Sequence, residues 1–224
     1  MEEYKINHYS CEISSVDIKE VYRYMGGMSE DNRLDDVIEK QTEIIISQAL
    51  PKAVYMITPV SCVYDEVDFG LFAYKSSALA VNLQGCSQAV IFGATIGHAV
   101  DREIMKYVCV SPVKALISQA VGTVLIEKTC NNLCDYISKC YGLNLKPRFS
   151  PGYADLELIG QKELFNVLNL EKNCGITLTD SYIMRPSKSV TAIAGISEFK
   201  TAVCNKDTKC LNCENKNCMY KIDM

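Results

Sequence analysis

The stretch Arg148-Phe149-Ser150-Pro151-Gly152-Tyr153 is the most informative part of the chain. It places a cation, a turn and an aromatic hydroxyl within six residues. Pro151 and Gly152 predict the turn, because Pro presets its backbone and Gly tolerates left-handed geometry. Arg148 can bind a carboxylate, and Tyr153 can contact a ring or a sulfonium group. With a nearby acid for an ammonium group, these residues form a clamp for a zwitterionic small molecule.

The helix predicted upstream of this stretch carries such an acid on its apolar side. Ser111-Pro112 predicts a helix start, and the helix should run from 112 to about 140. Apolar residues at helical spacing predict its buried face: Val113, Leu116, Ile117, Ala120, Val124, Leu133 and Ile137. Glu127 falls on the same side, where a carboxylate is costly unless it is paired. The alternative is a surface Glu at the edge of the stripe, but Arg148 favours a functional pair.

The remaining periodicities mix helices and strands without a regular alternation. We expect further helices at 14–25, 31–50, 76–83, 97–107 and 162–170, and strands at 54–64, 88–93, 176–179 and 189–196. Ser14 or Ser15 should cap the first helix, and Gly175 should close the last one. This order predicts an α+β fold, a single domain with a mixed or antiparallel twisted sheet flanked by helices. No G-x-G-x-x-G follows a strand, so a dinucleotide fold finds no support.

Composition excludes several classes of protein. The chain has 224 residues, 48% of them hydrophobic, and a formal net charge of −4. Mild acidity without a basic stripe argues against a nucleic-acid partner. The acidic start Met1-Glu2-Glu3-Tyr4 differs from a secretory signal, and no apolar run reaches the roughly 18 residues of a membrane span. We therefore expect a cytoplasmic protein that contacts neither nucleic acid nor membrane.

Four of the twelve cysteines crowd into the last part of the chain. They follow the pattern Cys204-x5-Cys210-x2-Cys213-x4-Cys218. Four thiolates at such spacing can hold zinc or an iron–sulfur cluster, and the ligand count leaves both open. The alternatives are a reduced thiol tail and, least favoured in a cytosolic protein, a disulfide pair. We expect a domain at 1–200 and a cysteine-rich metal-binding tail at 201–224, with the other eight cysteines acting as small hydrophobes.

Several segments in order resemble the S-adenosylmethionine-binding activation domain of cobalamin-dependent methionine synthase. The Arg148–Tyr153 stretch is similar to the Arg-Pro-x-Pro-Gly-Tyr motif of that family. The other matching segments are Phe92-Gly-Ala-Thr-Ile-Gly97, the helix with Glu127, Leu164-Phe165, Gly175-Ile-Thr-Leu-Thr-Asp-Ser-Tyr-Ile-Met184 and Pro186-Ser-Lys-Ser-Val190. The N-terminal Glu20-Val-Tyr-Arg-Tyr-Met-Gly26 is similar to the opening of stand-alone relatives of the domain.

The resemblance implies a specific activity. The family domain presents the methyl group of S-adenosylmethionine to a cobalamin that another domain or protein holds. Cobalamin that has been oxidised is reduced by one electron and remethylated. The resemblance places the ligand carboxylate at Arg148 and the adenosine near the backbone of Phe149, Ser150, Pro151 and Gly152. It places Tyr153 against the methionine or ribose, and it matches Glu127 to a family acid.

The chain also departs from the family. The strand Thr191-Ala-Ile-Ala-Gly195 lacks an aromatic residue that the family often has there, and no position matches the family's N-terminal acid. The chain has no room for a cobalamin domain, so it would act in trans, with a cobalamin-binding methionine synthase and an electron donor as partners. The alternative is a metal- or iron–sulfur-binding electron-transfer or interaction protein that has lost S-adenosylmethionine binding.

Overall fold

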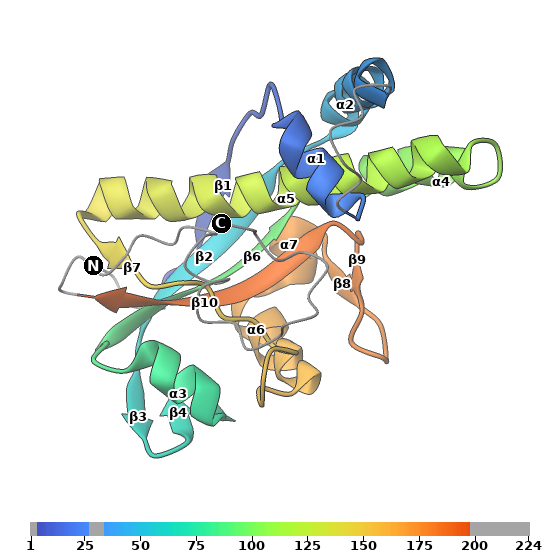
Figure 1. Ribbon diagram of the computed structural model, residues 1–224. Coiled ribbons are helices and arrows are strands. Elements are labelled where there is room, and N and C mark those ends of the chain that lie inside the picture. Colours follow the sequence, from blue (N-terminus) through green and yellow to red (C-terminus); the bar gives the residue numbers. More distant parts are fainter. Residues whose placement is uncertain (1–3, 27–33, 198–224) are drawn as a thin grey trace.

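The computed structural model describes residues 4–26 and 34–197, so the four tail cysteines lie outside the described residues. The described chain is built on a five-stranded antiparallel sheet of order β1-β2-β6-β10-β7 (Figure 1). The strand bounds are Asn7–Ser10 (β1), Lys52–Pro59 (β2), Gln88–Thr95 (β6), Asn144–Leu145 (β7) and Ser189–Ser197 (β10). The predicted α+β class and the twisted antiparallel sheet are confirmed.

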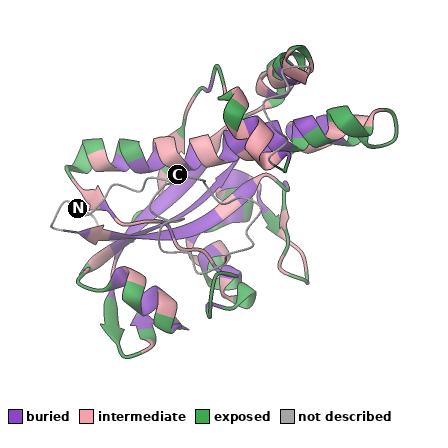
Figure 2. Ribbon diagram, in the orientation of Figure 1, coloured by how far each residue is buried: buried purple, intermediate pink, exposed green. Residues whose placement is uncertain are grey.

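Helices cover both faces of the sheet (Figure 1). One face carries α1 (Ile18–Tyr24), α2 (Asp35–Gln48), α4 (His98–Val108) and α5 (Pro112–Tyr141). The other face carries α3 (Ser77–Leu83), α6 (Gln161–Leu168) and α7 (Leu170–Cys174). Strands β2 and β6 are therefore almost entirely buried, and successive residues alternate between the two cores (Figure 2). This explains why both strands are continuous apolar runs.

Smaller elements surround this sheet. They are the three-stranded sheet β3 (Ser61–Val63), β4 (Glu66–Asp68) and β5 (Ala73–Lys75), the hairpin β8 (Thr177–Leu178) and β9 (Met184–Arg185), and the 3-10 helix Leu158–Gly160. The strand predicted at 54–64 is thus two strands, because the chain leaves the main sheet after Pro59 and enters the small one at Ser61. No helix in the described part of the chain is long and apolar enough to cross a membrane.

The start and length predicted for the long helix α5 are confirmed. The prediction that Val113 and Leu116 are buried is wrong. Val113 is 51% exposed and Leu116 is 44% exposed, whereas Ile117, Ala120 and Leu133 are buried. The reason is position: the first turns of α5 and the neighbouring α4 project beyond the sheet, where Figure 2 shows largely exposed ribbon. Helical spacing identifies a face but not where the opposing sheet ends.

Two predicted helix boundaries are also corrected. Asp17, rather than Ser14 or Ser15, caps α1, because its side chain accepts a hydrogen bond from the backbone N–H of Lys19 at 2.9 Å. The predicted helix 162–170 ends at Asn169, which adopts a left-handed conformation with φ of 48°. Gly175 closes the separate helix α7 instead, also in a left-handed conformation. Asn is the common non-glycine residue for such a helix end.

Candidate ligand-binding site

The stretch after β7 is fixed to the sheet by Phe149. Its backbone N–H donates to the carbonyl of Ile193 at 2.8 Å, and its carbonyl accepts from the N–H of Ile193 at 2.8 Å. The Phe149 ring packs against the core beneath α3, α6 and α7. Phe149, one of the predicted site residues, therefore anchors the segment to β10 and is not among the residues that line the pocket described below.

The turn that follows has the geometry that its sequence predicts. The N–H of Gly152 donates to the carbonyl of Leu156 at 2.8 Å, and that of Tyr153 donates to the carbonyl of Ser150 at 3.2 Å. Gly152 has a φ of +92°, which a residue with a Cβ rarely adopts. Tyr153 follows this turn, and 58% of the residue is exposed.

Asp155 ties this turn to the start of α3. Its carboxylate accepts hydrogen bonds from the Ser76 hydroxyl at 2.5 Å and from the backbone N–H groups of Ser77 at 2.7 Å and Ala78 at 3.2 Å. These bonds lower the pKa of Asp155, because they favour its charged form. The loop that carries Arg148 and Tyr153 is thus held at one end by β10 and at the other by α3.

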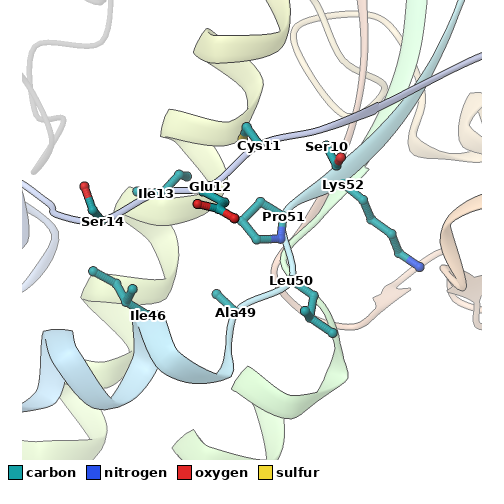
Figure 3. Close-up of a pocket in the computed structure, with 10 residues that line it drawn as sticks. All are labelled: Ser10, Cys11, Glu12, Ile13, Ser14, Ile46, Ala49, Leu50, Pro51 and Lys52. Carbon is teal, nitrogen blue, oxygen red and sulfur yellow. The ribbon is translucent and has the colours of Figure 1, made fainter.

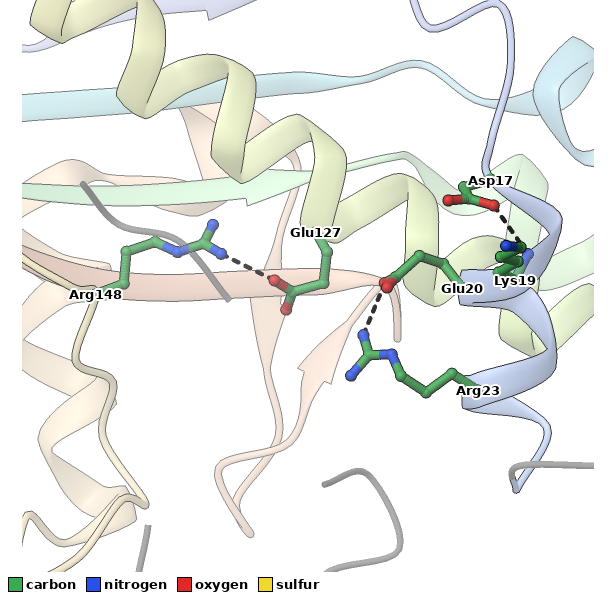
Figure 4. A network of polar contacts seen from close by, with 6 residues as sticks. All are labelled: Asp17, Lys19, Glu20, Arg23, Glu127 and Arg148. Carbon is green, nitrogen blue, oxygen red and sulfur yellow. Dashed lines mark hydrogen bonds and ion pairs between the residues drawn. The ribbon is translucent and has the colours of Figure 1, made fainter. Parts of the chain in front are cut away.

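Arg148 and Glu127 form an ion pair across the site. Figure 4 shows the two side chains pointing toward each other, and Nη2 of Arg148 donates to Oε2 of Glu127 at 2.9 Å. The Arg148 side chain is only 7% exposed, while that of Glu127 is 30% exposed. The pair predicted from the apolar face of α5 is therefore present, and Glu127 remains accessible to an incoming group.

A pocket of about 350 Å³ adjoins this pair. Six of the seven predicted binding residues line it: Glu127, Arg148, Ser150, Pro151, Gly152 and Tyr153. The other lining residues are Leu158, Gln161, Met184, Ser189, Val190, Thr191 and Ala192. The pocket thus lies along the outer edge of β10, between the α5 face and the α6 face of the sheet.

The edge of β10 contributes backbone groups to this pocket. Strand β7 pairs with β10 at Ile196 and Ser197, and Phe149 bridges to Ile193. Backbone groups of alternate residues point to the same edge of an antiparallel strand. The N–H and carbonyl of Thr191 therefore face the same side as those of Ile193, which is the side of the pocket. Polar backbone and the small Thr191 side chain therefore form this wall.

Helix α1 reaches the site in a way that the sequence did not indicate. Figure 4 shows Glu20 and Arg23 beyond Glu127, on the side away from Arg148, and these two residues form an ion pair at 2.7 Å. The guanidinium of Arg23 lies over the Tyr24 ring, 4.4 Å from its centroid. Burial and the charge of Glu127 both raise the pKa of Tyr24. The same two causes raise the pKa of Tyr153, so both phenols stay neutral beside the acid.

A second, larger pocket of about 770 Å³ lies elsewhere, between the segment after β1 and the end of α2 (Figure 3). Its charged lining residues are Glu12 and Lys52, and Figure 3 shows the Lys52 side chain extending away from Glu12. It contains none of the predicted site residues. Volume alone favours this pocket, but the paired charges that a zwitterion requires lie in the smaller one.

The metal prediction concerns residues beyond those described. Cys204, Cys210, Cys213 and Cys218 lie in the undescribed range 198–224, so the predicted metal set stays a prediction. Within residues 4–26 and 34–197, no group of three or more His, Cys, Asp or Glu side chains could hold a metal ion. The eight described cysteines are all free thiols, and three of them are buried: Cys130, Cys134 and Cys174.

The fold and the pocket define an α+β domain with a candidate small-molecule site at the edge of its central sheet. Residues 143–206 match the family model of the vitamin B12 dependent methionine synthase activation domain. Thirteen chains of solved structures match the chain. One is the crystal structure of the MetH reactivation domain bound to AdoHcy, with 14% identity and a TM-score of 0.63, covering 90% of this chain and 82% of that one. No curated protein gave a match. The resemblance predicted from the sequence is confirmed: the chain has the fold of this activation domain.

Proposed function

We propose that this chain binds S-adenosylmethionine in the Arg148–Glu127 pocket and reactivates a cobalamin-dependent methionine synthase in trans. The observation that carries the proposal is the pocket itself, in which a cation, an acid and an exposed tyrosine converge. It lies partly within the segment 143–206 that matches the activation-domain family. The related MetH reactivation domain was crystallised with AdoHcy, the product that remains when S-adenosylmethionine loses its methyl group.

The ion pair explains how an amino-acid head group would bind. The guanidinium of Arg148 and the carboxylate of Glu127 carry opposite charges, with Nη2 and Oε2 2.9 Å apart. The amino-acid part of the ligand carries a carboxylate that complements Arg148 and an ammonium group that complements Glu127. The ligand carboxylate takes hydrogen bonds from Arg148, and the ligand ammonium group donates to Glu127. Because Arg148 is buried and held by its loop, little side-chain entropy is lost on binding. A pocket of about 350 Å³ lies within the roughly 300–1,000 Å³ that small-molecule sites occupy.

The methyl acceptor must come from a partner. The reduced cobalt of a corrinoid on the partner supplies the nucleophile, and an external one-electron donor keeps it reduced. The contribution of this chain is to hold and orient the methyl donor, which is catalysis by positioning. Tyr153 and Leu158 line the pocket and are 58% and 40% exposed, so the ligand would be held next to an accessible surface.

The proposal is tested with purified chain, S-adenosylmethionine labelled in its methyl group, a cobalamin-binding methionine synthase and a low-potential reductant. Label should reach the corrinoid protein when all components are present. It should not reach a small thiol when this chain and S-adenosylmethionine are incubated alone. Efficient methylation of a small thiol by the chain alone would contradict the proposal. Transfer of electrons without any use of S-adenosylmethionine would favour the alternative function in electron transfer or metal binding.

A further inference from the structure

We propose that Gln161, the first residue of α6, is a ligand-binding residue that accepts a hydrogen bond from the nucleoside half of the ligand. The inference rests on the proposed function, since it assigns one wall of the same pocket. Gln161 is 5% exposed and lines the pocket together with Gly152, Leu158 and Thr191. Neither the family motif nor the sequence pattern singles out this position.

The observation is an amide oxygen that lacks a donor. Among the residues that the structure describes, no hydrogen-bond donor reaches Oε1 of Gln161, and this atom is buried. Buried polar atoms almost always have a partner, because an unmade hydrogen bond leaves the loss of water uncompensated. The last torsion of a glutamine side chain is broad, so a turn of the amide can present its oxygen to the pocket. A ligand that fills the pocket can supply the donor.

The position of Gln161 indicates which part of the ligand it contacts. The pocket is lined by Glu127 of α5, by Gln161 of α6 and by residues of β10. Figure 1 shows α5 and α6 on opposite sides of β10. The charges that bind the amino-acid head group lie on the side of α5. The nucleoside half therefore extends toward Gln161, where it offers hydroxyl and amino donors. A glutamine oxygen accepts from either kind of donor, so the shared chemistry is an uncharged hydrogen-bond donor.

Two matched variants separate a ligand contact from a structural role. Gln161→Met removes the amide and keeps the length of the side chain. Gln41→Met is the control: Gln41 is also buried, at 2% exposed, but its Oε1 accepts from the Ser118 hydroxyl at 3.0 Å and lies outside the pocket.

Binding of S-adenosylmethionine is measured by calorimetry, and stability by the urea midpoint. Gln161→Met should weaken binding about 5- to 15-fold, the worth of one hydrogen bond, without lowering the urea midpoint. Gln41→Met should lower the midpoint and leave binding unchanged.

Ligand analogues identify the donor. The 2′-deoxy, 3′-deoxy and 6-deamino (purine riboside) analogues of S-adenosylhomocysteine each remove one donor group, and each is compared with S-adenosylhomocysteine. The analogue that lacks the bonded group should bind wild type more weakly and bind Gln161→Met as well as the parent compound does. Equal affinity of wild type and Gln161→Met for S-adenosylmethionine would overturn the inference while leaving the proposed function intact. Absence of binding to wild type would instead overturn the proposed function, and this inference with it.

Discussion

Arg148 carries the charge on which ligand binding depends most. Replacing Arg148 with Ala should weaken S-adenosylmethionine binding by about 1.5–3 kcal/mol, the usual contribution of a charge-assisted hydrogen bond. Arg148→Lys should recover part of the loss, because an ammonium group keeps the charge but cannot form the planar guanidinium fork. Isothermal titration calorimetry measures both effects.

The control for Arg148 is Arg102→Ala, on the exposed side of α4 and outside the pocket. That variant should bind S-adenosylmethionine like wild type. If Arg148→Ala and Arg102→Ala bound the ligand equally well, Arg148 would not be the carboxylate-binding residue, and the ion pair with Glu127 would be structural.

At the scale of single elements, substitutions in α5 test which of its residues are packed against the rest of the fold. Leu133 is fully buried, and Leu116 is 44% exposed on the same helix. Leu133→Ala should destabilise the fold by about 2–5 kcal/mol, whereas Leu116→Ala should change the free energy of unfolding by at most about 0.5–1 kcal/mol. Urea denaturation of the two variants measures the difference. Equal costs would mean that the first turns of α5 are covered by something that the described residues do not include.

The hydrogen bonds of Asp155 to the start of α3 should make the free energy of unfolding depend on pH. Hydrogen bonds from Ser76, Ser77 and Ala78 lower the pKa of Asp155 in the folded state relative to the unfolded chain. The carboxylate therefore stabilises the fold above the unfolded pKa of about 3.9, and this contribution is lost as the pH falls through the lower folded pKa. Asp155→Asn should be less stable than wild type at pH 7, and the difference should shrink below about pH 4.

Urea midpoints between pH 7 and pH 3 measure this effect, with the exposed Asp180→Asn as the control. A difference between Asp155→Asn and wild type that stayed constant across the whole range would show that the charge of Asp155 is not what holds the loop. Asp180→Asn should follow wild type throughout, because the structure gives its carboxylate no comparable set of donors among the described hydrogen bonds.

Elements with strong local signals were predictable from sequence, and those set by tertiary contacts were not. Ser111-Pro112 and the left-handed Gly142 define the ends of α5, and Ser76 caps α3 through the N–H of Leu79. By contrast, the two-residue strand β7 exists only through its pairing with β10. The split between α6 and α7 depends on a single left-handed Asn169, which a helical apolar pattern does not reveal.

The same distinction holds for the site. Arg148, Gly152 and Tyr153 lie in one motif, and Glu127 is marked by its apolar surroundings, so all four could be found from sequence. Gln161 lines the pocket because α6 begins beside the turn, and Tyr24 lies near Glu127 because α1 packs against α5. Their local sequences resemble those of ordinary amphipathic helices, so only the packed structure assigns them to the site.

At the scale of the whole molecule, the tail is expected to behave as a separate unit. We predict that Cys204, Cys210, Cys213 and Cys218 bind one metal centre and that removing it unfolds the last 20 or so residues while the core survives. Protein prepared without oxygen should be analysed for zinc, iron and sulfide. Iron with sulfide would indicate a redox cluster, and one zinc would indicate a structural site. Four freely titratable thiols without metal would contradict the prediction.

The central claim is that the pocket beside the Arg148–Glu127 ion pair binds S-adenosylmethionine. The most direct test is calorimetric titration of S-adenosylmethionine into the wild-type chain of residues 1–224, with no partner present. We expect saturable binding with one ligand per chain. Absence of any binding at millimolar ligand, with the protein folded, would contradict the claim and leave a chain that keeps the activation-domain fold without its ligand.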